Sequence, residues 1–318
     1  MSVHRALAPA KVNLGLFLGP TRATDGRHEL VTVMQSISLA DELTLEPAPV
    51  GAGADEIVCP GVPGLPQDNL AAAALRAFRA GSGWDGPAMR LRIHKRIPVA
   101  AGLGGGSADA AATLRLAAHA SGVGERELLL EIATELGADV PAQVAPGRWL
   151  ASGAGERLQP LPDPSSAFGL LILPAEGGLS TASVYGEADR LGLARSQGEL
   201  EQRRLELLSA FEHGAPLAAA TELLHNDLQR AAVSLHPDIA EALRAARGAG
   251  AELTMVSGSG PTVLGLFTHS PGPGGGADFA SLAAGALQAR VPRALSATPV
   301  GEDFGRAVTL PPPLAQAG

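Results

Sequence analysis

The chain has 318 residues, 46% of them hydrophobic and 18% charged, which is enough for one large core or two ordinary domains. The formal net charge of −8 argues against a general nucleic-acid surface but does not exclude a local anion site. The single cysteine, Cys59, excludes an intramolecular disulfide framework and a multi-cysteine metal site. The N-terminal segment does not read as a leader, and no apolar run approaches the ~20 residues of a membrane span. We therefore expect a cytoplasmic protein with neither nucleic-acid nor membrane partners.

Hydrophobic periodicity and turn residues predict an alternation of strands and helices along the chain. The pattern predicts strands at 11–18, 30–39 and 41–45, a helix at 70–79 capped by Asp68 or Asn69, a strand at 89–97, helices at 107–120 and 125–136, a strand at 168–173, helices at 198–210, 217–232 and 237–247, and strands at 251–256 and 262–267. A proline-rich stretch at 159–164 predicts an N-terminal domain at 1–160 and a C-terminal domain at 161–310. A flexible loop at 270–276 and a disordered tail at 311–318 complete the prediction.

The segment GLGGGSADA at 102–110 stands between a predicted strand and a predicted helix. Glycines let the backbone approach an anion, and a helix N-terminus offers free N–H groups and the positive end of a dipole. The pattern therefore indicates a phosphate loop, and a plain structural turn is the alternative. Walker A is excluded because neither lysine follows a glycine, and G-x-G-x-x-G because Ser107 stands at the last glycine position. The Ser107 hydroxyl could cap the helix, meet a phosphate or bind magnesium.

The chain contains only two lysines, Lys11 and Lys95, so each needs a specific reason. Lys11 lies among apolar residues of the first predicted strand, where an unpaired ammonium would cost several kcal/mol to bury, unless it reaches water at the strand edge. Asp139 stands between a glycine and a proline, and local sequence alone favours a helix N-cap for it. The eight histidines show no spacing typical of a zinc site. Neither Lys11 nor Asp139 identifies a site by itself.

Five segments, taken together and in order, resemble the GHMP kinase superfamily of small-molecule kinases. They are APAKVNL at 8–14, TDGRHEL at 24–30, RIPVAAGLGGGSADAA at 96–111, LGADVP at 136–141 and GSGPTV at 258–263. The resemblance runs from about residue 5 to residue 267. It implies two α+β domains, an N-terminal one of the ribosomal protein S5 domain 2-like type and a ferredoxin-like C-terminal one, with the active site between them. Within the superfamily, PAKVNL, GLGGGS and GADVP are most typical of the kinases of the non-mevalonate isoprenoid pathway, which phosphorylate a cytidine-diphosphate-linked sugar alcohol.

The resemblance also implies roles for individual residues, with ATP and Mg²⁺ as cofactors. Asp139 would accept the proton of the substrate 2-hydroxyl, while Lys11 orients Asp139 and offsets charge on the transferring phosphoryl group. The implied ATP-binding residues are Asn69, Lys95, Pro98, Gly102, Leu103, Gly104, Gly105, Gly106 and Ser107. Ser107 is also the candidate magnesium ligand. The implied substrate-binding residues are Asn13, Arg27, His28, Thr181 and Tyr185.

The cytidine end of the substrate would be held by an aromatic sandwich, according to the same resemblance. His28 would read the cytosine edge, and Tyr185, in the strand after the domain boundary, would stack on one face of the base. Arg27 stands where the family has the second aromatic side chain, and an arginine plane can itself stack on a base. A second departure is Ala108, where the family commonly has another serine, which leaves Ser107 alone to meet phosphate or metal.

Three other functions fit parts of the sequence. Another member of the superfamily, of the homoserine or mevalonate kinase type, would not need the pocket at His28 and Tyr185. A non-catalytic nucleotide-binding module on the same scaffold would need neither Lys11 nor Asp139. A nicotinamide-dependent oxidoreductase would need a glycine at position 107. The sequence does not predict the oligomeric state.

Overall fold

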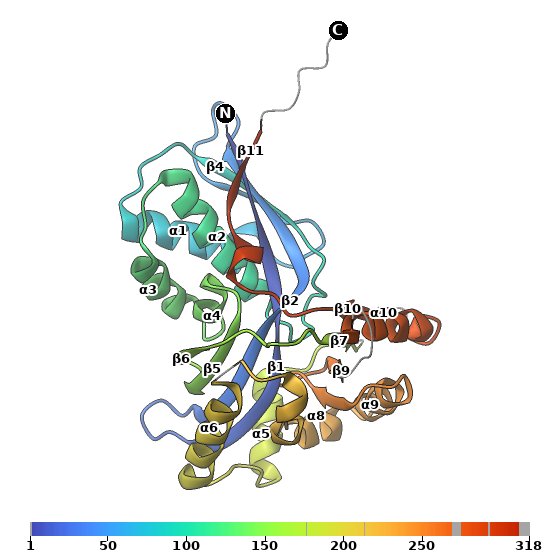
Figure 1. The fold of residues 1–318 in the computed structure, drawn as a ribbon. Coiled ribbons are helices and arrows are strands. Elements are labelled where there is room, and N and C mark those ends of the chain that lie inside the picture. The colour runs from blue at the N-terminus through green and yellow to red at the C-terminus, as the bar shows by residue number, and fades with distance from the viewer. Residues whose placement is uncertain (1, 176, 213, 269–274, 292, 312–318) are drawn as a thin grey trace.

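The computed structural model describes residues 2–175, 177–212, 214–268, 275–291 and 293–311, and shows an α+β protein built on two sheets (Figure 1). The seven-stranded first sheet contains β1 (Val3–Thr21), β2 (His28–Pro47), β3 (Glu56–Val58), β4 (Met89–His94), β5 (Arg148–Gly153), β6 (Arg157–Leu161) and β11 (Val308–Leu310). The second sheet contains β7 (Gly169–Leu173), β8 (Leu253–Val256), β9 (Val263–Phe267) and β10 (Leu295–Ala297), in the order β10-β7-β9-β8. Apart from the parallel pair β3–β4, neighbouring strands are antiparallel.

The helices fall into two groups along the chain (Figure 1). The first group lies beside the upper part of the first sheet and contains α1 (Leu70–Ser82), α2 (Gly105–Ser121), α3 (Arg126–Leu136) and α4 (Val140–Val144). The second group contains α5 (Thr181–Arg190), α6 (Gln197–Phe211), α7 (Leu217–Ala220), α8 (Gln229–Leu235), α9 (Asp238–Gly248) and α10 (Gly275–Leu287). Short 3₁₀ turns lie at 66–68, 221–223 and 302–305. Among the described helices, none has the length and apolar character that a membrane crossing requires.

The long strand β1 forms the centre of the core. Its residues from 8 to 18 are buried on both faces, because α2 covers one face of the sheet and other elements cover the opposite one. Helix α2 is alanine-rich and packs against β1, α1 and α4, so that Ala110, Ala111 and Ala112 are fully buried on successive sides of the helix. Small side chains at this contact bring the helix backbone near to β1, and they place the N-terminal end of α2 beside Lys11.

Residues 30–47 form one strand, so the prediction of two separate strands there was wrong. β2 runs unbroken from His28 to Pro47, but its register against β1 shifts in the middle. Pro9 pairs with Ala40, whereas Lys11 pairs with Ser36, so the ladder contains a bulge at this point. The bulge interrupts the alternation of apolar and polar side chains that the sequence reading relied on.

The prediction of a single helix at 217–232 is also wrong, because the chain turns at residues 224–228, between the 3₁₀ turn at 221–223 and α8. Asn226 Oδ1 accepts a hydrogen bond from Leu228 N at 2.9 Å, and Asp227 Oδ2 accepts one from Leu18 N at 3.0 Å. Asparagine and aspartate compete with helical bonding in this way. The predicted strand at 89–97 likewise ends at His94, since Asp41 Oδ1 accepts hydrogen bonds from the main-chain N–H groups of Arg96 and Ile97.

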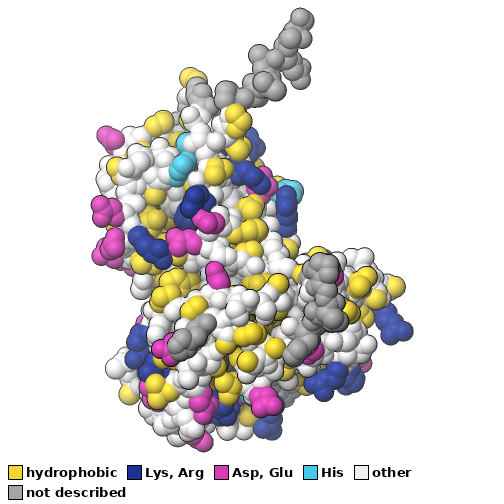
Figure 2. Space-filling view, viewed as in Figure 1, with side chains coloured by type: hydrophobic (Ala, Val, Ile, Leu, Met, Phe, Trp, Pro, Cys, Tyr) yellow, Lys and Arg dark blue, Asp and Glu magenta, His cyan; other side chains and the backbone are white. Residues whose placement is uncertain are grey.

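The boundary proposed at residues 160 and 161 stays a prediction. Strands β7 to β10 follow it and build the second sheet, while β11 returns to pair with β1 in the first sheet. Most of the predicted loop at 270–276 and nearly all of the predicted tail lie outside the described residues, and α10 begins at Gly275. On the face in Figure 2, acidic and basic side chains are interspersed over both groups of helices.

Candidate active site

Lys11 and Asp139 meet where β1 passes the N-terminal end of α4. Lys11 Nζ lies 3.2 Å from Asp139 Oδ2, and it donates a hydrogen bond to Asn13 Oδ1 at 3.0 Å. The Lys11 side chain is 11% exposed and the Asp139 side chain 38%, so the carboxylate is the member of the pair that faces open space. Pairing with Asp139 therefore offsets the free-energy cost of burying the Lys11 ammonium group.

Asp139 occupies the N-cap position of α4, but its side chain makes no capping hydrogen bond within the described part of the chain. The role favoured by local sequence alone, a side-chain N-cap, is therefore wrong. The backbone reaches this position through Gly137, which ends α3 with its N–H bonded to Ala133 O. The carboxylate is thereby left available for Lys11 and for a molecule in the adjacent cavity.

Asn13 links Lys11 to the middle of the first sheet. Its Nδ2 donates to Thr32 Oγ1 at 2.8 Å, and the Thr32 hydroxyl in turn donates to Gly15 O at 2.6 Å. The main-chain N–H of Asn13 donates to Ser257 Oγ at 3.3 Å. Because Asn13 and Lys11 lie on the same face of β1 and both are buried, these bonds fix the direction in which the ammonium points.

The glycine loop crosses directly over Lys11. Leu103 O accepts a hydrogen bond from Lys11 N at 2.9 Å, and Gly104, with a φ of +69°, is the N-cap of α2. On its other side, a Cβ at Gly102 would lie 2.5 Å from Gly260 O, and Ala101 O accepts a 2.6 Å bond from Thr262 Oγ1. The loop is therefore held between β1 and the turn at 257–262, and glycines are needed for both close approaches.

Two cavities border this loop, and the predicted site residues divide between them. Every predicted ATP-binding residue, from Asn69 to Ser107, lines a cavity of about 420 Å³. Lys11, Asp139 and every predicted substrate-binding residue line a second cavity of about 650 Å³. Gly102, Gly104 and Ser107 line both cavities. The glycine loop and the start of α2 thus lie where two molecules, one in each cavity, would meet.

The first cavity contains a buried charge cluster that sequence reading did not find. Lys95 Nζ lies 2.5 Å from Asp41 Oδ2 and 2.7 Å from Asp109 Oδ2. Burial alone would lower the pKa of Lys95, but the two carboxylates outweigh it and raise that pKa. Burial and the neighbouring Asp41 also raise the pKa of Asp109, against the opposing effect of Lys95. Lys95 is therefore held at the base of the loop rather than extended into solvent. Asn69 borders the same cavity and caps α1 by accepting from Ala71 N at 2.9 Å.

In the second cavity His28 and Tyr185 lie together, with their ring centroids 5.4 Å apart. His28 Nδ1 lies 3.0 Å from Gly19 O, and its Nε2 lies 3.1 Å from Asp189 Oδ1. Burial raises the pKa of Tyr185 to about 12, with a smaller contribution from the Asp139 charge, so the phenol stays neutral. Tyr185 belongs to helix α5, which corrects the prediction of a strand for that segment.

Arg27 reaches the same cavity from the turn before β2. Its Nη2 donates to Ala154 O at 2.9 Å, and its main-chain N–H donates to Asp25 Oδ1 at 3.1 Å. These bonds hold the side chain at the rim of the cavity that also contains Tyr185. The guanidinium group of Arg27 therefore lines the cavity at the sequence position where the resemblance leads us to expect an aromatic ring.

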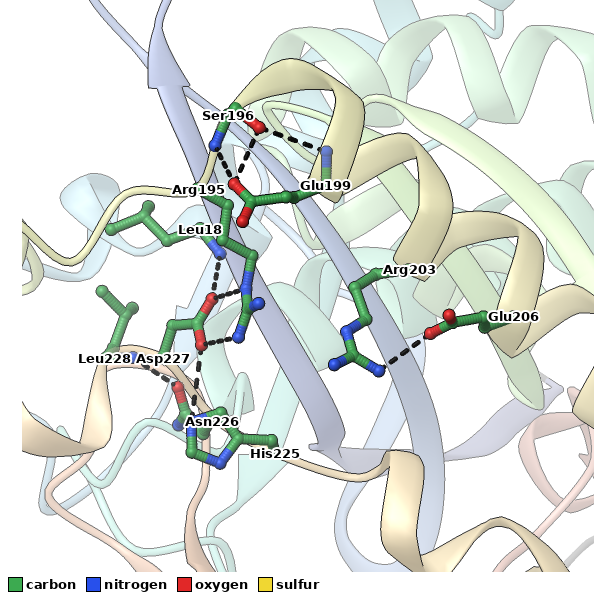
Figure 3. Close-up of polar contacts among 10 residues, drawn as sticks. All are labelled: Leu18, Arg195, Ser196, Glu199, Arg203, Glu206, His225, Asn226, Asp227 and Leu228. Atoms are coloured by element: carbon green, nitrogen blue, oxygen red, sulfur yellow. Dashed lines mark hydrogen bonds and ion pairs between the residues drawn. The ribbon is translucent and has the colours of Figure 1, made fainter.

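The turn at 257–260 closes the second cavity from the side of the second sheet. Thr181 Oγ1 and Ser259 Oγ are 3.1 Å apart, and Asn226 Nδ2 donates to Val256 O and Gly258 O at 2.7 and 2.8 Å. Figure 3 shows the neighbouring Asp227, which binds Arg195 through two bonds of 2.6 and 2.7 Å and also binds Leu18 N on β1. This network ties the turn to the strand that carries Lys11.

Sequence reading missed several polar residues that shape the site. Asp41, Asp109 and Asp189 each contact a predicted residue, and Thr32 and Ser257 orient Asn13. Asp109 carried one signal, because it lies in the first turns of the helix that follows the glycine loop. The others come from distant segments, and nothing in their local pattern indicated that they would reach the site.

Comparison with known proteins gives this geometry a family. The model of the GHMP kinases N terminal domain matches residues 69–147, and that of the GHMP kinases C terminal matches residues 205–273. A 4-diphosphocytidyl-2-C-methyl-D-erythritol kinase of Anaeromyxobacter dehalogenans is 44% identical over 289 residues, covering 89% of this chain and 85% of the relative. A second such kinase, from Salinispora tropica, is 43% identical and covers 82% of each chain.

Solved structures agree with the sequence comparisons. A crystal structure of 4-(cytidine 5'-diphospho)-2C-methyl-D-erythritol kinase superposes with a TM-score of 0.71 at 34% identity, over 93% of this chain and 99% of the other. A homoserine kinase from Cytophaga hutchinsonii reaches a TM-score of 0.65 over 97% of each chain, but at 17% identity it shows the fold alone. The two-domain GHMP kinase fold implied by the resemblance is thereby confirmed. This chain is a GHMP kinase and belongs, within that superfamily, to the 4-diphosphocytidyl-2-C-methyl-D-erythritol kinase family.

Proposed function

We propose that the protein transfers the γ-phosphoryl group of ATP to the 2-hydroxyl of 4-diphosphocytidyl-2-C-methyl-D-erythritol, a step of the non-mevalonate route to isoprenoid precursors. The observation that carries this proposal is the junction of the two cavities at Gly102, Gly104 and Ser107, beside the pair of Lys11 and Asp139. A nucleotide in the first cavity would present its phosphates to an acceptor in the second. The curated relatives at 43–44% identity support the choice of acceptor.

Asp139 and Lys11 supply the chemistry expected of such a site. In the proposed step, the acceptor oxygen attacks the γ-phosphorus, its proton passes to the Asp139 carboxylate, and the bond to the bridging oxygen breaks to release ADP. Lys11 keeps the carboxylate oriented from 3.2 Å and places a positive charge beside the transferring group. Phosphoryl transfer depends on positioning and electrostatics more than on covalent participation by the protein, so this arrangement is adequate for it.

The proposed ATP site combines the glycine loop with the first turn of α2. Gly105 and Gly106 open that helix, so unpaired N–H groups and the positive end of the helix dipole face the loop. The donor set suits Mg²⁺ held mainly by phosphate oxygens and water, since Mg²⁺ seldom needs more than one or two protein ligands. We assign the Ser107 hydroxyl as its protein ligand. When bound, the ion would neutralise charge on the β- and γ-phosphates.

The proposed cytidyl site lies around His28, Tyr185 and Arg27. A neutral, half-buried tyrosine offers a ring face for stacking, and the guanidinium plane of Arg27 offers a second flat surface. Asn13 and Thr181 supply amide and hydroxyl groups toward the rest of the acceptor. The departure from the family pattern at Arg27 therefore leaves a usable pocket. We propose a cytoplasmic location, without nucleic-acid or membrane partners.

The test is ADP release by the purified protein with ATP and magnesium, comparing the cytidyl acceptor with homoserine and with mevalonate. Turnover on the cytidyl acceptor alone is the expected result. Turnover only on homoserine or mevalonate would retain the roles of Lys11 and Asp139 but contradict the cytidyl site. No turnover on any of the three acceptors would instead favour a nucleotide-binding module.

A further inference from the structure

Asp139 lies at the N-terminal end of helix α4, and the position of its carboxylate depends on contacts made by other residues. Within the described residues its side chain forms no capping bond to the helix, and its recorded ionic partner is Lys11. Helix α4 has only five residues, and a helix this short depends on tertiary contacts for its position. The contacts that fix α4 therefore also fix the distance between Asp139 and Lys11.

Gln143 ties α4 to both strands next to Lys11. Its Nε2 donates to Pro9 O at 3.1 Å, and its Oε1 accepts from Ser36 Oγ at 3.2 Å. Pro9 precedes Lys11 by two residues on β1, and Ser36 is the residue of β2 that pairs with Lys11. Gln143 is 1% exposed, so both bonds lie in the interior, where an unmade hydrogen bond is costly.

These two bonds reach the sheet at its irregular point. Pro9 pairs with Ala40 and Lys11 pairs with Ser36, so the β1–β2 ladder shifts between the two contacts of Gln143. Gln143 thus contacts both strands at the bulge, whose extra residues lie on β2 between Ser36 and Ala40. The other four residues of α4 are valine, proline, alanine and valine, so Gln143 provides the polar side-chain link between this helix and the sheet.

Arg115 of α2 reinforces the same connection through the main chain. Its Nη1 donates to Gln143 O, and its Nη2 donates to Leu7 O on β1 at 2.9 Å. Burial lowers the pKa of Arg115 to about 10, which still leaves it charged at neutral pH. Gln143 is therefore held through its main-chain carbonyl as well as through its side chain. The side chain bonds to Pro9 on β1, and Arg115 links the carbonyl to Leu7 on the same strand.

We propose that Gln143 is a positioning residue, which sets the alignment of Asp139 with Lys11 by fixing α4 to the strand on either side of the β1–β2 bulge. The inference rests on the proposed function, in which Asp139 accepts the proton of the acceptor hydroxyl. Alignment of the reacting groups is a large part of catalysis, and a displacement of about 1 Å can cost ~10²-fold in rate. Loss of the anchor should consequently affect the chemical step more than the binding of either substrate.

The test uses Gln143→Met and Trp149→Phe as a matched pair. Methionine keeps the length of the side chain and suits a helix, but it cannot form either bond. Trp149 Nε1 donates to Ala145 O at 3.0 Å, so Trp149→Phe removes a hydrogen bond at the opposite end of the same helix. For both variants the measurements are Tm, kcat, and KM for ATP and for the cytidyl acceptor.

Gln143→Met is expected to lower kcat by about 10- to 100-fold and to leave both KM values within about threefold. Trp149→Phe is expected to keep kcat within about threefold even where its Tm falls. A wild-type kcat in Gln143→Met, or losses of kcat that simply follow Tm in both variants, would overturn the proposal. If Gln143→Met does not fold, Ser36→Ala removes one of the two anchor bonds and is judged by the same split between kcat and KM.

A crystal structure of Gln143→Met separates this inference from the proposed function. The expected result is a distance from Asp139 Oδ2 to Lys11 Nζ that exceeds the 3.2 Å of the parent chain. An unchanged distance would overturn the positioning role whatever the turnover. A lengthened distance, in a protein whose parent shows no transfer to the cytidyl acceptor, would support the positioning role and contradict the proposed function instead.

Discussion

Gly104 lies so close to Lys11 that a methyl group on Gly104 would stand 2.8 Å from Lys11 Cγ. The same residue has a φ of +69° and is the N-cap of α2. Gly104 therefore meets two requirements of the glycine loop at once. It opens the way for phosphate at the helix N-terminus, and it makes room for the lysine side chain beneath it.

Substitution Gly104→Ala should damage turnover by displacing Lys11. Gly83 is the matched control, because it has a φ of +67° and nothing within 4 Å of the added methyl group. Both substitutions should cost about 1–2 kcal/mol of stability through backbone strain. Only Gly104→Ala should also lower kcat, by about tenfold or more. Measured kcat and Tm for the pair decide the matter, and a wild-type kcat in Gly104→Ala would show that the contact has no catalytic consequence.

Arg27→Tyr tests the stacking surface of the cytidyl site. If the guanidinium and an aromatic ring fill one position opposite Tyr185, KM for the cytidyl acceptor should stay equal or fall, with KM for ATP unchanged. Arg27→Ala removes the flat surface and should raise KM for the acceptor by about 5- to 100-fold, the range expected for loss of stacking on one base. A large rise in KM for the acceptor in Arg27→Tyr would instead assign Arg27 a charge-dependent contact.

His4 should make the docking of β11 sensitive to pH. His4 Nδ1 and His119 Nε2 lie 3.1 and 3.0 Å from Thr309 Oγ1, and the two rings are 5.3 Å apart. Burial, and then the neighbouring His119, lower the pKa of His4 below its ordinary value of 6.5. The native state therefore binds fewer protons at His4 than the unfolded chain does. The free energy of unfolding is consequently highest above pH 6.5 with respect to His4, and it decreases as the pH falls below 6.5.

The measurement is Tm between pH 8 and pH 5 for the parent chain and for His4→Gln. The parent should lose more Tm on acidification than the variant, because glutamine does not titrate. The protection factors for amide exchange at Val308–Leu310 should fall over the same pH interval in the parent, since these residues pair with β1 beside His4. Parallel Tm curves for the two proteins would contradict the assignment to His4.

The local features of the site could be predicted from sequence, since they depend on neighbouring residues. The glycine loop followed by a helix, and a helix cap at Asp68 or Asn69, follow from short-range patterns, and the structure assigns the cap to Asn69. Short-range patterns alone favoured a strand-edge position for Lys11 with its ammonium in water, whereas the side chain is buried. The pairing of Lys11 with Asp139 could not be derived in this way, because the chain between them folds through several elements. The resemblance to a family predicted that Lys11 and Asp139 lie together, and in the structure Lys11 Nζ is 3.2 Å from Asp139 Oδ2.

The features that sequence reading missed share a physical cause. Asp41 ends the strand at His94 by binding the N–H groups of Arg96 and Ile97, and Asp227 breaks a predicted helix by binding Leu18 N. In each case an aspartate side chain bonds to main-chain N–H groups of a segment distant in the sequence, and this contact takes the place of regular local backbone bonding. Periodicity describes how a segment would bury its own apolar face, and it carries no information about such partners.

The central claim is that Asp139 accepts the acceptor proton in the chemical step, and Asp139→Asn tests it most directly. The asparagine keeps the size of the side chain but removes its basicity and its charge toward Lys11. The measurement is a single-turnover transfer of the γ-phosphoryl group from saturating ATP to the cytidyl acceptor, together with Kd for ATP. The account predicts an unchanged Kd and a transfer rate lowered by at least about 10²-fold. A transfer rate equal to that of the parent protein would contradict it.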